Sequence, residues 1–449
     1  MSSKIGFISL GCSKNQIDTE IMLKILADNG YEIVIEDIHA DIIIINTCAF
    51  IESAKQEAID NILDVAWLKQ NRNLKSIIVC GCLAERYREE VLKELPEIDA
   101  LIGVFSIHDI LDAVRYCEDK NKNKEKYISL KPRDGFVSGG ERILTTPEYT
   151  AYIKIADGCD NRCSYCIIPS IRGGFKSRSI EDIVKEACEL ADIGVKELCV
   201  VAQDTTAYPD LPELLDKLCE IDGIKWLRLL YCYPDKITDE LIATIKNQDK
   251  ILKYIDMPIQ HINDGILSSM NRKGGGKAIK SAIKRLRENI PGITVRTTVI
   301  TGFPGETKEI FGELCEFLRE AKFERLGAFA YSAEEGTPAF EFENQIAAKE
   351  KERRQKIIMA QQERINHSLH QKKIGMTIRV LCEGFDKAGG VYYCRSEADA
   401  PEIDGKIYFV GCGDPGAPQT KINEGEFVDV KIEKVLDYDL FGECAARAT

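Results

Sequence analysis

The chain has 449 residues, of which 44% are apolar, and it can therefore bury several hydrophobic cores. Its formal net charge of −13 argues against nonspecific attraction to a nucleic acid backbone, so we expect nucleic-acid binding to be weak or indirect. No signal peptide and no run of ~18 apolar residues is found, which predicts a cytoplasmic protein without a membrane partner whose seventeen cysteines are thiols and metal ligands.

Residues 1–120 alternate short apolar runs with longer stretches of helical spacing, which predicts an N-terminal α/β domain with an open parallel sheet. Each of three predicted strands runs into a cysteine. The strands span residues 5–10, 41–45 and 76–80, and the cysteines are Cys12, Cys48 and Cys82. Because parallel strands emerge at one edge of an open sheet, we expect these thiols to converge. Free cysteines also fill strand ends as small apolar side chains, so this pattern alone leaves both packing and metal binding open.

Cys80 is a fourth cysteine of this region. It lies in the strand two residues before Cys82, so the period of two predicts that both side chains share a face. Cys82 is the preferred ligand because it lies past the strand end, where the amides of a following helix favour a thiolate.

Residues 121–145 are polar and rich in lysine, which predicts a linker. Residues 146–374 then contain six strand–helix repeats and a charged helical segment, and six repeats predict a partial (βα)6 barrel. The predicted strands span residues 151–156, 197–202, 226–231, 254–259, 294–300 and 325–331. In such barrels the reactive groups lie on loops at the carboxyl ends of the strands.

The loop after the first of these strands contains three cysteines within eight positions, Cys159, Cys163 and Cys166. Three thiolates can bind three irons of a cubane iron–sulfur cluster, whose full set needs four cysteine ligands. One iron would therefore stay open to bind another molecule. The alternatives are three unrelated thiols or a zinc site that lacks a ligand, but no second Cys/His pair follows at zinc-finger distance.

Polar residues follow other strands of the barrel as well. They include Gln203 to Thr206, Tyr233, Gln260 with His261, and residues 301–307. Turn chemistry and helix capping explain each group singly, but together on one rim they predict a ligand cleft. A structural hydrogen bond explains His261 as well as acid–base work does.

The last part of the chain predicts a helix and a small barrel. Residues 346–373 are dense in helix formers and charges, which predicts a solvated linker helix. Residues 375–446 form short strand patterns separated by Gly, Asp and Pro, which predicts a β-barrel. Residues 376–449 contain eight basic and fourteen acidic residues, and this excess of acid disfavours RNA and favours a cationic protein partner. The same charge also serves solubility.

The loop of Cys159, Cys163 and Cys166 resembles the signature loop of radical S-adenosylmethionine (SAM) enzymes, in which the open iron binds the amino and carboxylate groups of SAM. The resemblance implies that Tyr165, just before the last cysteine, packs near the adenine, and a packing role in the loop is compatible with this. The rim described above then becomes a SAM and substrate cleft, to which we assign Gln203 and Gln260.

Further motifs resemble the methylthiotransferases, which are radical SAM enzymes with a second cluster on an upstream cysteine trio and a C-terminal TRAM domain. The upstream motifs are residues 11–15, 46–48 and 81–86, and those of the barrel are residues 168–173, 177–178, 257–261, 302–307 and 331–337. The resemblance assigns the second cluster to Cys12, Cys48 and Cys82 and leaves out Cys80. Residues 271–276 and 208–210 depart from the family pattern, the first by extra glycine.

Residues 203–206, 395–405 and 438–443 are similar to the branch that adds a methylthio group to the β-carbon of an aspartate in small-subunit ribosomal protein S twelve. The resemblance implies an enzyme with two 4Fe-4S clusters, SAM and an external electron donor, and no catalytic residue beyond the clusters. One alternative is a tRNA adenosine methylthiotransferase with the same chemistry, which the TRAM position suggests. Another is a noncatalytic iron–sulfur electron carrier or sensor, which two open clusters disfavour.

Overall fold

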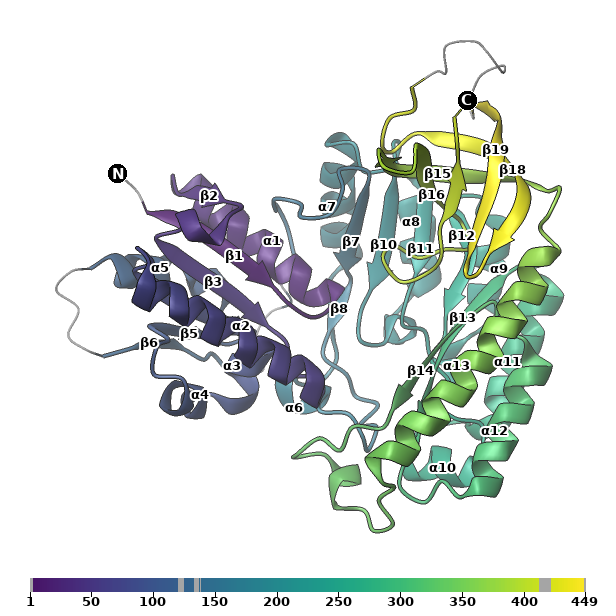
Figure 1. The fold of residues 1–449 in the computed structure, drawn as a ribbon, viewed down its shortest axis with the longest axis horizontal. Helices are drawn as coiled ribbons and strands as arrows, with labels where there is room; N and C mark the ends of the chain where they lie inside the picture. Colours follow the sequence, from purple (N-terminus) through teal and green to yellow (C-terminus); the bar gives the residue numbers. More distant parts are fainter. Residues whose placement is uncertain (1–2, 120–124, 133–136, 138, 412–420, 448–449) are drawn as a thin grey trace.

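The computed structural model describes residues 3–119, 125–132, 137, 139–411 and 421–447. Over these residues the chain forms two open parallel sheets, one two-stranded ribbon and one closed barrel (Figure 1). The fold class predicted from the sequence is confirmed: an open α/β domain is followed by a partial (βα)6 barrel and a small β-barrel.

The N-terminal sheet has six parallel strands in the order β2-β1-β3-β4-β5-β6. Its strands are β1 (Lys4–Ser9), β2 (Glu32–Val34), β3 (Ile42–Thr47), β4 (Ser76–Gly81), β5 (Ala100–Ile102) and β6 (Tyr127–Ser129). The helices are α1 (Ser13–Asp28), α2 (Glu52–Asn71), α3 (Cys82–Tyr87), α4 (Glu89–Glu94) and α5 (Ile110–Glu118). β3 is buried along its whole length, which explains its unbroken run of isoleucine, since helices cover both faces of a parallel sheet. β6 comes from the segment predicted as a linker.

The central sheet also has six parallel strands, in the order β14-β13-β12-β11-β10-β7. They are β7 (Thr150–Lys154), β10 (Glu197–Val201), β11 (Trp226–Leu229), β12 (Ile251–Asp256), β13 (Thr294–Thr301) and β14 (Arg325–Ala330). In the part of the chain that the structure describes, the outer strands β7 and β14 do not pair, so the barrel is open. Its helices are α6 (Ile168–Arg172), α7 (Ile180–Asp192), α8 (Leu211–Glu220), α9 (Asp239–Asn247), α10 (Asp264–Ser269), α11 (Gly275–Asn289) and α12 (Lys308–Ala321).

The fourth strand of this barrel was predicted over residues 254–259 and lies three residues earlier, at Ile251–Asp256. Pro258 has no backbone N–H to donate, so it cannot continue a central strand, and the chain leaves the ladder before it. The buried Ile251 and Leu252 begin the strand instead.

The long helix α13 (Ala348–Gln371) forms where a linker helix was predicted, but it is not solvated on every side. Ile358, Gln362 and Ile365 are buried, and the Gln362 side chain donates to the Phe323 carbonyl. Spacings of three and four residues place these side chains on one helical face.

None of the described helices, α13 included, combines the length and the apolar character that a membrane span requires.

The C-terminal barrel closes in the order β15-β16-β17-β19-β18. Its strands are β15 (Thr377–Asp386), β16 (Val391–Ser396), β17 (Ile407–Phe409), β18 (Phe427–Leu436) and β19 (Asp439–Arg447). It packs against the amino ends of the central strands, at the end of the sheet opposite to the cysteine loop (Figure 1). The segment between β16 and β17 enters this end of the central barrel, where Asp399 pairs with Arg325 and Asp404 accepts a hydrogen bond from Tyr254 at 2.8 Å.

A buried ion network joins the two barrels. Glu197, the first residue of β10, accepts from Arg228 at 2.8 Å and from Arg395 at 2.5 Å, and all three side chains are withdrawn from solvent. Buried charges are tolerated only when they are paired: Glu197 contacts both guanidinium groups, and Glu383 supplies a second carboxylate to Arg395 at 2.7 Å.

Replacing Glu197 with glutamine is therefore expected to destabilise the protein by about 3–5 kcal/mol, because two buried arginines lose their shared carboxylate. Thermal unfolding of the apoprotein, followed by circular dichroism, measures this change. Glu288→Gln, in the exposed pair Lys284–Glu288, is the control and should cost no more than about 1 kcal/mol. Equal unfolding temperatures for the two variants would contradict the assignment.

Candidate functional site

The structure brings the thiols of Cys12, Cys48 and Cys82 together at the carboxyl edge of β1, β3 and β4. Cys12 is the N-cap of α1, Cys48 follows β3, and Cys82 begins α3. Gly11 has a φ of +99°, and a Cβ there would lie 3.2 Å from the Cys48 Sγ, so only glycine lets the two turns approach this closely.

The three thiols are close enough to affect one another's pKa. The pKa of Cys82 is raised to about 12, chiefly by burial and also by the neighbouring Cys12 and Cys48, while Arg172 acts to lower it. Burial likewise raises the pKa of Cys48. Cys12 is the exposed member of the trio, and its pKa is lowered. The protein around the thiol removes water from it and so acts to raise the pKa, but the positive charges of Lys14 and Arg172 outweigh this effect. The nearby cations thus favour the thiolate at Cys12, whereas burial keeps Cys48 and Cys82 protonated until a metal displaces their protons.

Cys80 does not share a face with Cys82, contrary to the prediction. The Cys80 side chain packs with Ile78 in one core cluster, whereas Cys82 packs with Val79 in the other. The reason is Gly81, whose φ of +91° turns the strand directly into α3 and ends the alternation of period two. A Cβ at Gly81 would lie 2.2 Å from Asn46 Oδ1, which fixes glycine at this turn.

The second trio lies in the loop after β8 (Ala156–Asp157), which pairs with β9 (Lys176–Ser177). Burial raises the pKa of Cys166 to about 12, and the neighbouring thiols of Cys163 and Cys159 add to this effect. The amide of Cys159 donates to the Gly173 carbonyl at 3.1 Å. The loop therefore holds all three thiols at the carboxyl end of the central barrel, as the sequence predicts.

Asp204 fixes this loop from the neighbouring strand. Its carboxylate accepts from Asn161 at 2.6 Å, from Lys236 at 2.5 Å and from Thr206 at 2.7 Å. Asn161 in turn points an amide at the Cys159 Sγ, 3.5 Å away. The Asp204-Thr205-Thr206 motif thus supports the cysteine loop; Asp204 and Thr205 are fully buried and have no exposed surface for a substrate.

Two residues contact Cys163: Tyr233, which the sequence placed on the polar rim, and Arg272, which the sequence did not single out as a site residue. The Arg272 guanidinium lies 3.9 Å from the Cys163 Sγ and 4.0 Å from the ring centroid of Tyr233, whose hydroxyl is 3.8 Å from the same sulfur. Arg272 belongs to residues 271–276, where the chain departs from the family pattern, and this departure is the signal that could have drawn attention to it. A cation beside a sulfur favours its thiolate.

The proposed SAM residues border the same loop. Gln203 donates to Asp157 Oδ1 at 2.7 Å, and the side-chain oxygens of Gln203 and Gln260 are buried without a hydrogen-bond partner in the described part of the chain. Tyr165 packs against an apolar cluster that includes Met270 and Phe303. A buried oxygen without a donor is costly, so both glutamines are suited to receive one from a ligand.

His261 makes a structural contact. Its ring is fully buried, its Nδ1 accepts from the Asn263 amide at 3.0 Å, and burial lowers its pKa to about 3. The ring is therefore neutral at physiological pH, and it holds the turn into α10.

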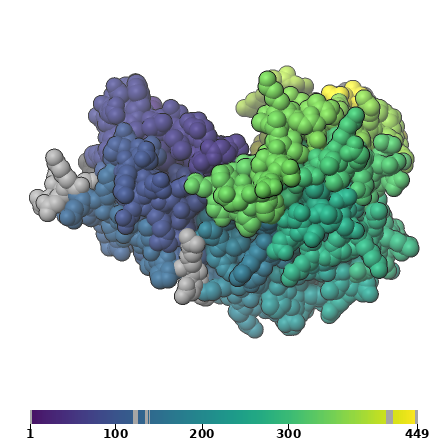
Figure 2. All heavy atoms as spheres, turned by 90° about the horizontal axis from the view of Figure 1, so that it is seen from below, coloured from purple at the N-terminus to yellow at the C-terminus, as the bar shows by residue number. Residues whose placement is uncertain are grey.

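A buried network of four charges connects the two trios. Lys154 and Arg172 of the central domain pair with Asp18 of α1 and with Asp157, and Arg172 also lies 4.0 Å from the Cys82 Sγ. A second contact joins the same domains at another point, where Arg86 pairs with Glu334 at 3.0 Å. In Figure 2 the segment after β14 meets the N-terminal domain there.

Neither trio has the geometry of a site for one metal ion: within the described ranges no three His, Cys, Asp or Glu side chains converge as single-ion ligands do. In a cubane cluster each thiolate binds its own iron, and each trio supplies three thiols. Close glycine turns and nearby cations also suit a large anionic group.

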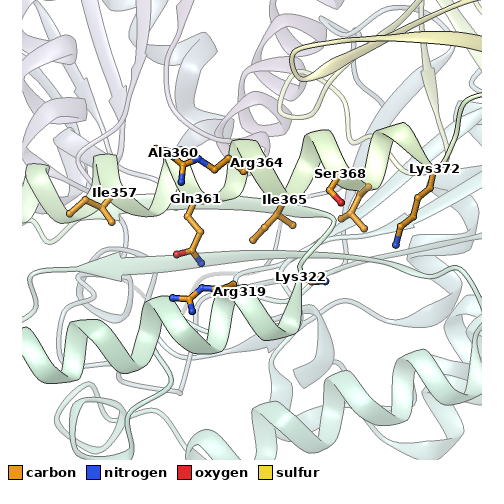
Figure 3. Close-up of a pocket in the computed structure, with 10 residues that line it drawn as sticks. Arg319, Lys322, Ile357, Ala360, Gln361, Arg364, Ile365, Ser368 and Lys372 are labelled. Atoms are coloured by element: carbon orange, nitrogen blue, oxygen red, sulfur yellow. The ribbon is translucent and has the colours of Figure 1, made fainter.

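One cavity lies away from these residues, between α12 and α13 (Figure 3). It measures about 540 Å³, and it is lined by apolar side chains together with Arg319, Lys322, Arg364 and Lys372. It contains none of the predicted site residues.

Comparison with known families agrees with this architecture. The model of the Radical SAM superfamily matches residues 153–318, that of the uncharacterized protein family UPF0004 matches residues 4–103, and that of the TRAM domain matches residues 374–445. Among solved structures, the radical S-adenosylmethionine methyltransferase TsrM from Kitasatospora setae shares the fold, with a TM-score of 0.56 and 15% identity over 76% of this chain and 77% of that chain. The fold and its domains define a radical SAM enzyme, a class that uses an iron–sulfur cluster and SAM.

Curated relatives show to which family of radical SAM enzymes the chain belongs. Proteins named ribosomal protein uS12 methylthiotransferase RimO are 48% identical in Thermoanaerobacter sp., over 98% of this chain and 99% of the relative, and 47% identical in Clostridioides difficile, over 98% of each. The chain belongs to this RimO family of methylthiotransferases.

Gly158→Ala is expected to disrupt the cysteine loop, because a Cβ there would lie 2.1 Å from the Gly174 carbonyl oxygen, at a φ of +76°. We expect the reconstituted variant to lose most of the iron of this loop and its SAM cleavage. Iron analysis and 5′-deoxyadenosine formation measure both. Gly194→Ala imposes similar backbone strain, with a φ of +105° and open space around it, and it should retain iron; equal iron in the two variants would refute the steric argument.

Proposed function

We propose that this chain is a cytoplasmic enzyme that adds a methylthio group to the β-carbon of an aspartate in small-subunit ribosomal protein uS12. The observation that carries the proposal is the pair of cysteine trios, one in each of two domains, with a buried ion network between them. The names of the relatives support the substrate.

In this proposal Cys159, Cys163 and Cys166 hold one 4Fe-4S cluster, with Tyr165, Gln203 and Gln260 around the SAM that binds its open iron. With both groups bound and an external electron donor, this site would supply the radical chemistry that the unactivated β-carbon of an aspartate requires. Asp204 and Asn161 hold the loop in place, and the buried glutamine oxygens orient SAM. This positioning matters because a radical reaction needs its partners in contact and water excluded.

Cys12, Cys48 and Cys82 hold the second 4Fe-4S cluster, which carries the sulfur to be transferred. Lys14 and Arg172 favour the thiolate of Cys12, and Arg172 opposes the effect of burial at Cys82. A second SAM supplies the methyl group.

The acidic C-terminal barrel lies at the far end of the central strands, away from both trios. Its charge therefore contributes to the approach of a cationic ribosomal protein and not to the chemistry itself. No basic RNA-binding surface is needed for this approach, and contact with nucleic acid is weak or indirect.

The two trios predict different defects. Cys159→Ala is expected to abolish SAM cleavage, because the loop loses a ligand of its cluster. Cys12→Ala should retain cleavage and lose methylthio transfer. High-performance liquid chromatography of 5′-deoxyadenosine and mass spectrometry of the modified protein measure the two activities, and Cys188→Ala, an exposed cysteine of α7, is the control.

Full methylthio transfer by Cys12→Ala would show that the assignment of two clusters is wrong. SAM cleavage by the reconstituted wild-type protein would exclude a noncatalytic electron carrier or sensor.

The substrate is tested in a strain that lacks the gene. We expect the methylthio mass of ribosomal protein uS12 to disappear while methylthiolated adenosine in tRNA is unchanged. Mass spectrometry of both fractions measures this. The TRAM domain makes tRNA the competing substrate. Loss of the methylthio group from tRNA alone would show that tRNA, and not uS12, is the substrate.

A further inference from the structure

The Arg172 side chain lies between the two cysteine trios and faces both. Its Nη2 is 2.9 Å from Asn15 Oδ1, 3.0 Å from Asp18 Oδ2 and 4.0 Å from the Cys82 Sγ, all in the N-terminal domain. Its Nη1 donates at 2.7 Å to Asp157, the residue that opens the loop of Cys159. Nη2 thus contacts the N-terminal site, and Nη1 contacts the residue that begins the cysteine loop of the central domain.

The surroundings hold this guanidinium in one orientation. Arg172, Asp18 and Lys154 are almost fully buried, and Lys154 donates to Asp18 at 2.6 Å while it lies 3.5 Å from Asp157. Two cations and two carboxylates balance, which is the condition under which buried charges are tolerated. The planar fork of arginine reaches partners on both sides at fixed angles, which the single nitrogen of a lysine cannot do.

A positive charge and an N–H group beside a cluster sulfur stabilise the more negative, reduced state of that cluster. We infer that Arg172 is a positioning residue that holds Cys82 in register with the Cys159 loop and raises the reduction potential of the cluster on Cys12, Cys48 and Cys82. The inference rests on the proposed function, which places that cluster there.

A purely structural role is the competing explanation, and Arg86 provides the comparison. It joins the same two domains through a buried pair with Glu334, and it donates to the carbonyls of Ala49 and Glu335 at 2.8 and 2.9 Å. None of these contacts is with a sulfur. If Arg172 only fastened the domains, the loss of either arginine would have similar effects on the cluster.

The test uses the full chain with Cys159, Cys163 and Cys166 all replaced by alanine and reconstituted with iron and sulfide, so that only the N-terminal cluster is present. Its potential is measured by a redox titration followed by electron paramagnetic resonance. On this background Arg172→Gln should lower the potential, because a cation is lost, and Asp18→Asn should raise it, because an anion is lost. Arg86→Gln should leave it unchanged.

The two variants are expected to shift the reduction potential in opposite directions, so the test remains decisive even if one of them loses stability. If Arg172→Gln does not bind the cluster, the rise in potential with Asp18→Asn supports the inference and its absence overturns it. A shift of the same sign in both variants, or no shift, also overturns it. A parent chain that binds no cluster contradicts the proposed function and the inference with it, whereas a loaded parent without shifts contradicts the inference alone.

Arg172→Lys separates charge from geometry. In the chain with all six cysteines it should lower the methylthio product formed per SAM cleaved by about 10- to 100-fold, the usual effect of losing a residue that orients a metal ligand. On the background that has only the N-terminal cluster, the potential should move less than in Arg172→Gln. Unchanged product per SAM cleaved would refute the positioning role.

Discussion

Lys154, Arg172, Asp18 and Asp157 share one dry space between the N-terminal sheet and the central barrel. A shift of one domain that broke one of these pairs while its partner stayed buried would leave an uncompensated charge, which costs about 3–5 kcal/mol. The pairing therefore fixes how β7 and β8 lie against α1. Cys12 caps α1, and the loop of Cys159 follows β8. The spacing between the two thiol sites therefore depends on this network more than on the cysteine loops themselves.

The sheets could be predicted because their signals are local. Runs such as Ile42 to Ile45 and the alternation of strand and helix determine parallel sheets, and parallel sheets determine the edge at which loops gather. The convergence of Cys12, Cys48 and Cys82 follows from topology alone. The errors arose where one residue overrides a pattern: Pro258 ends β12 early, and Gly81 turns Cys82 away from the face of Cys80.

The supporting residues of the site could not be predicted, because they come from segments that only the tertiary fold brings together. Arg172 is separated by 90 residues from Cys82, and Arg272 by 109 from Cys163. No periodicity or spacing in the sequence relates such pairs. Asp204 shows the converse, since this residue of a motif that suggested the substrate is buried and holds the cysteine loop.

The segment between β16 and β17 has a consequence for the order in which the protein is made. Arg228 and Arg325 belong to the middle of the chain, but the groups that accept from or pair with them include Glu397 and Asp399, which are synthesised later. Domains generally fold in order from the N-terminus as the chain emerges. Until residues 397–399 have emerged, Arg325 lacks the carboxylate of Asp399 and Arg228 lacks the Glu397 carbonyl, although Glu197 of the same barrel already pairs with Arg228. The amino end of the central barrel is therefore completed only after the segment between β16 and β17 has been synthesised.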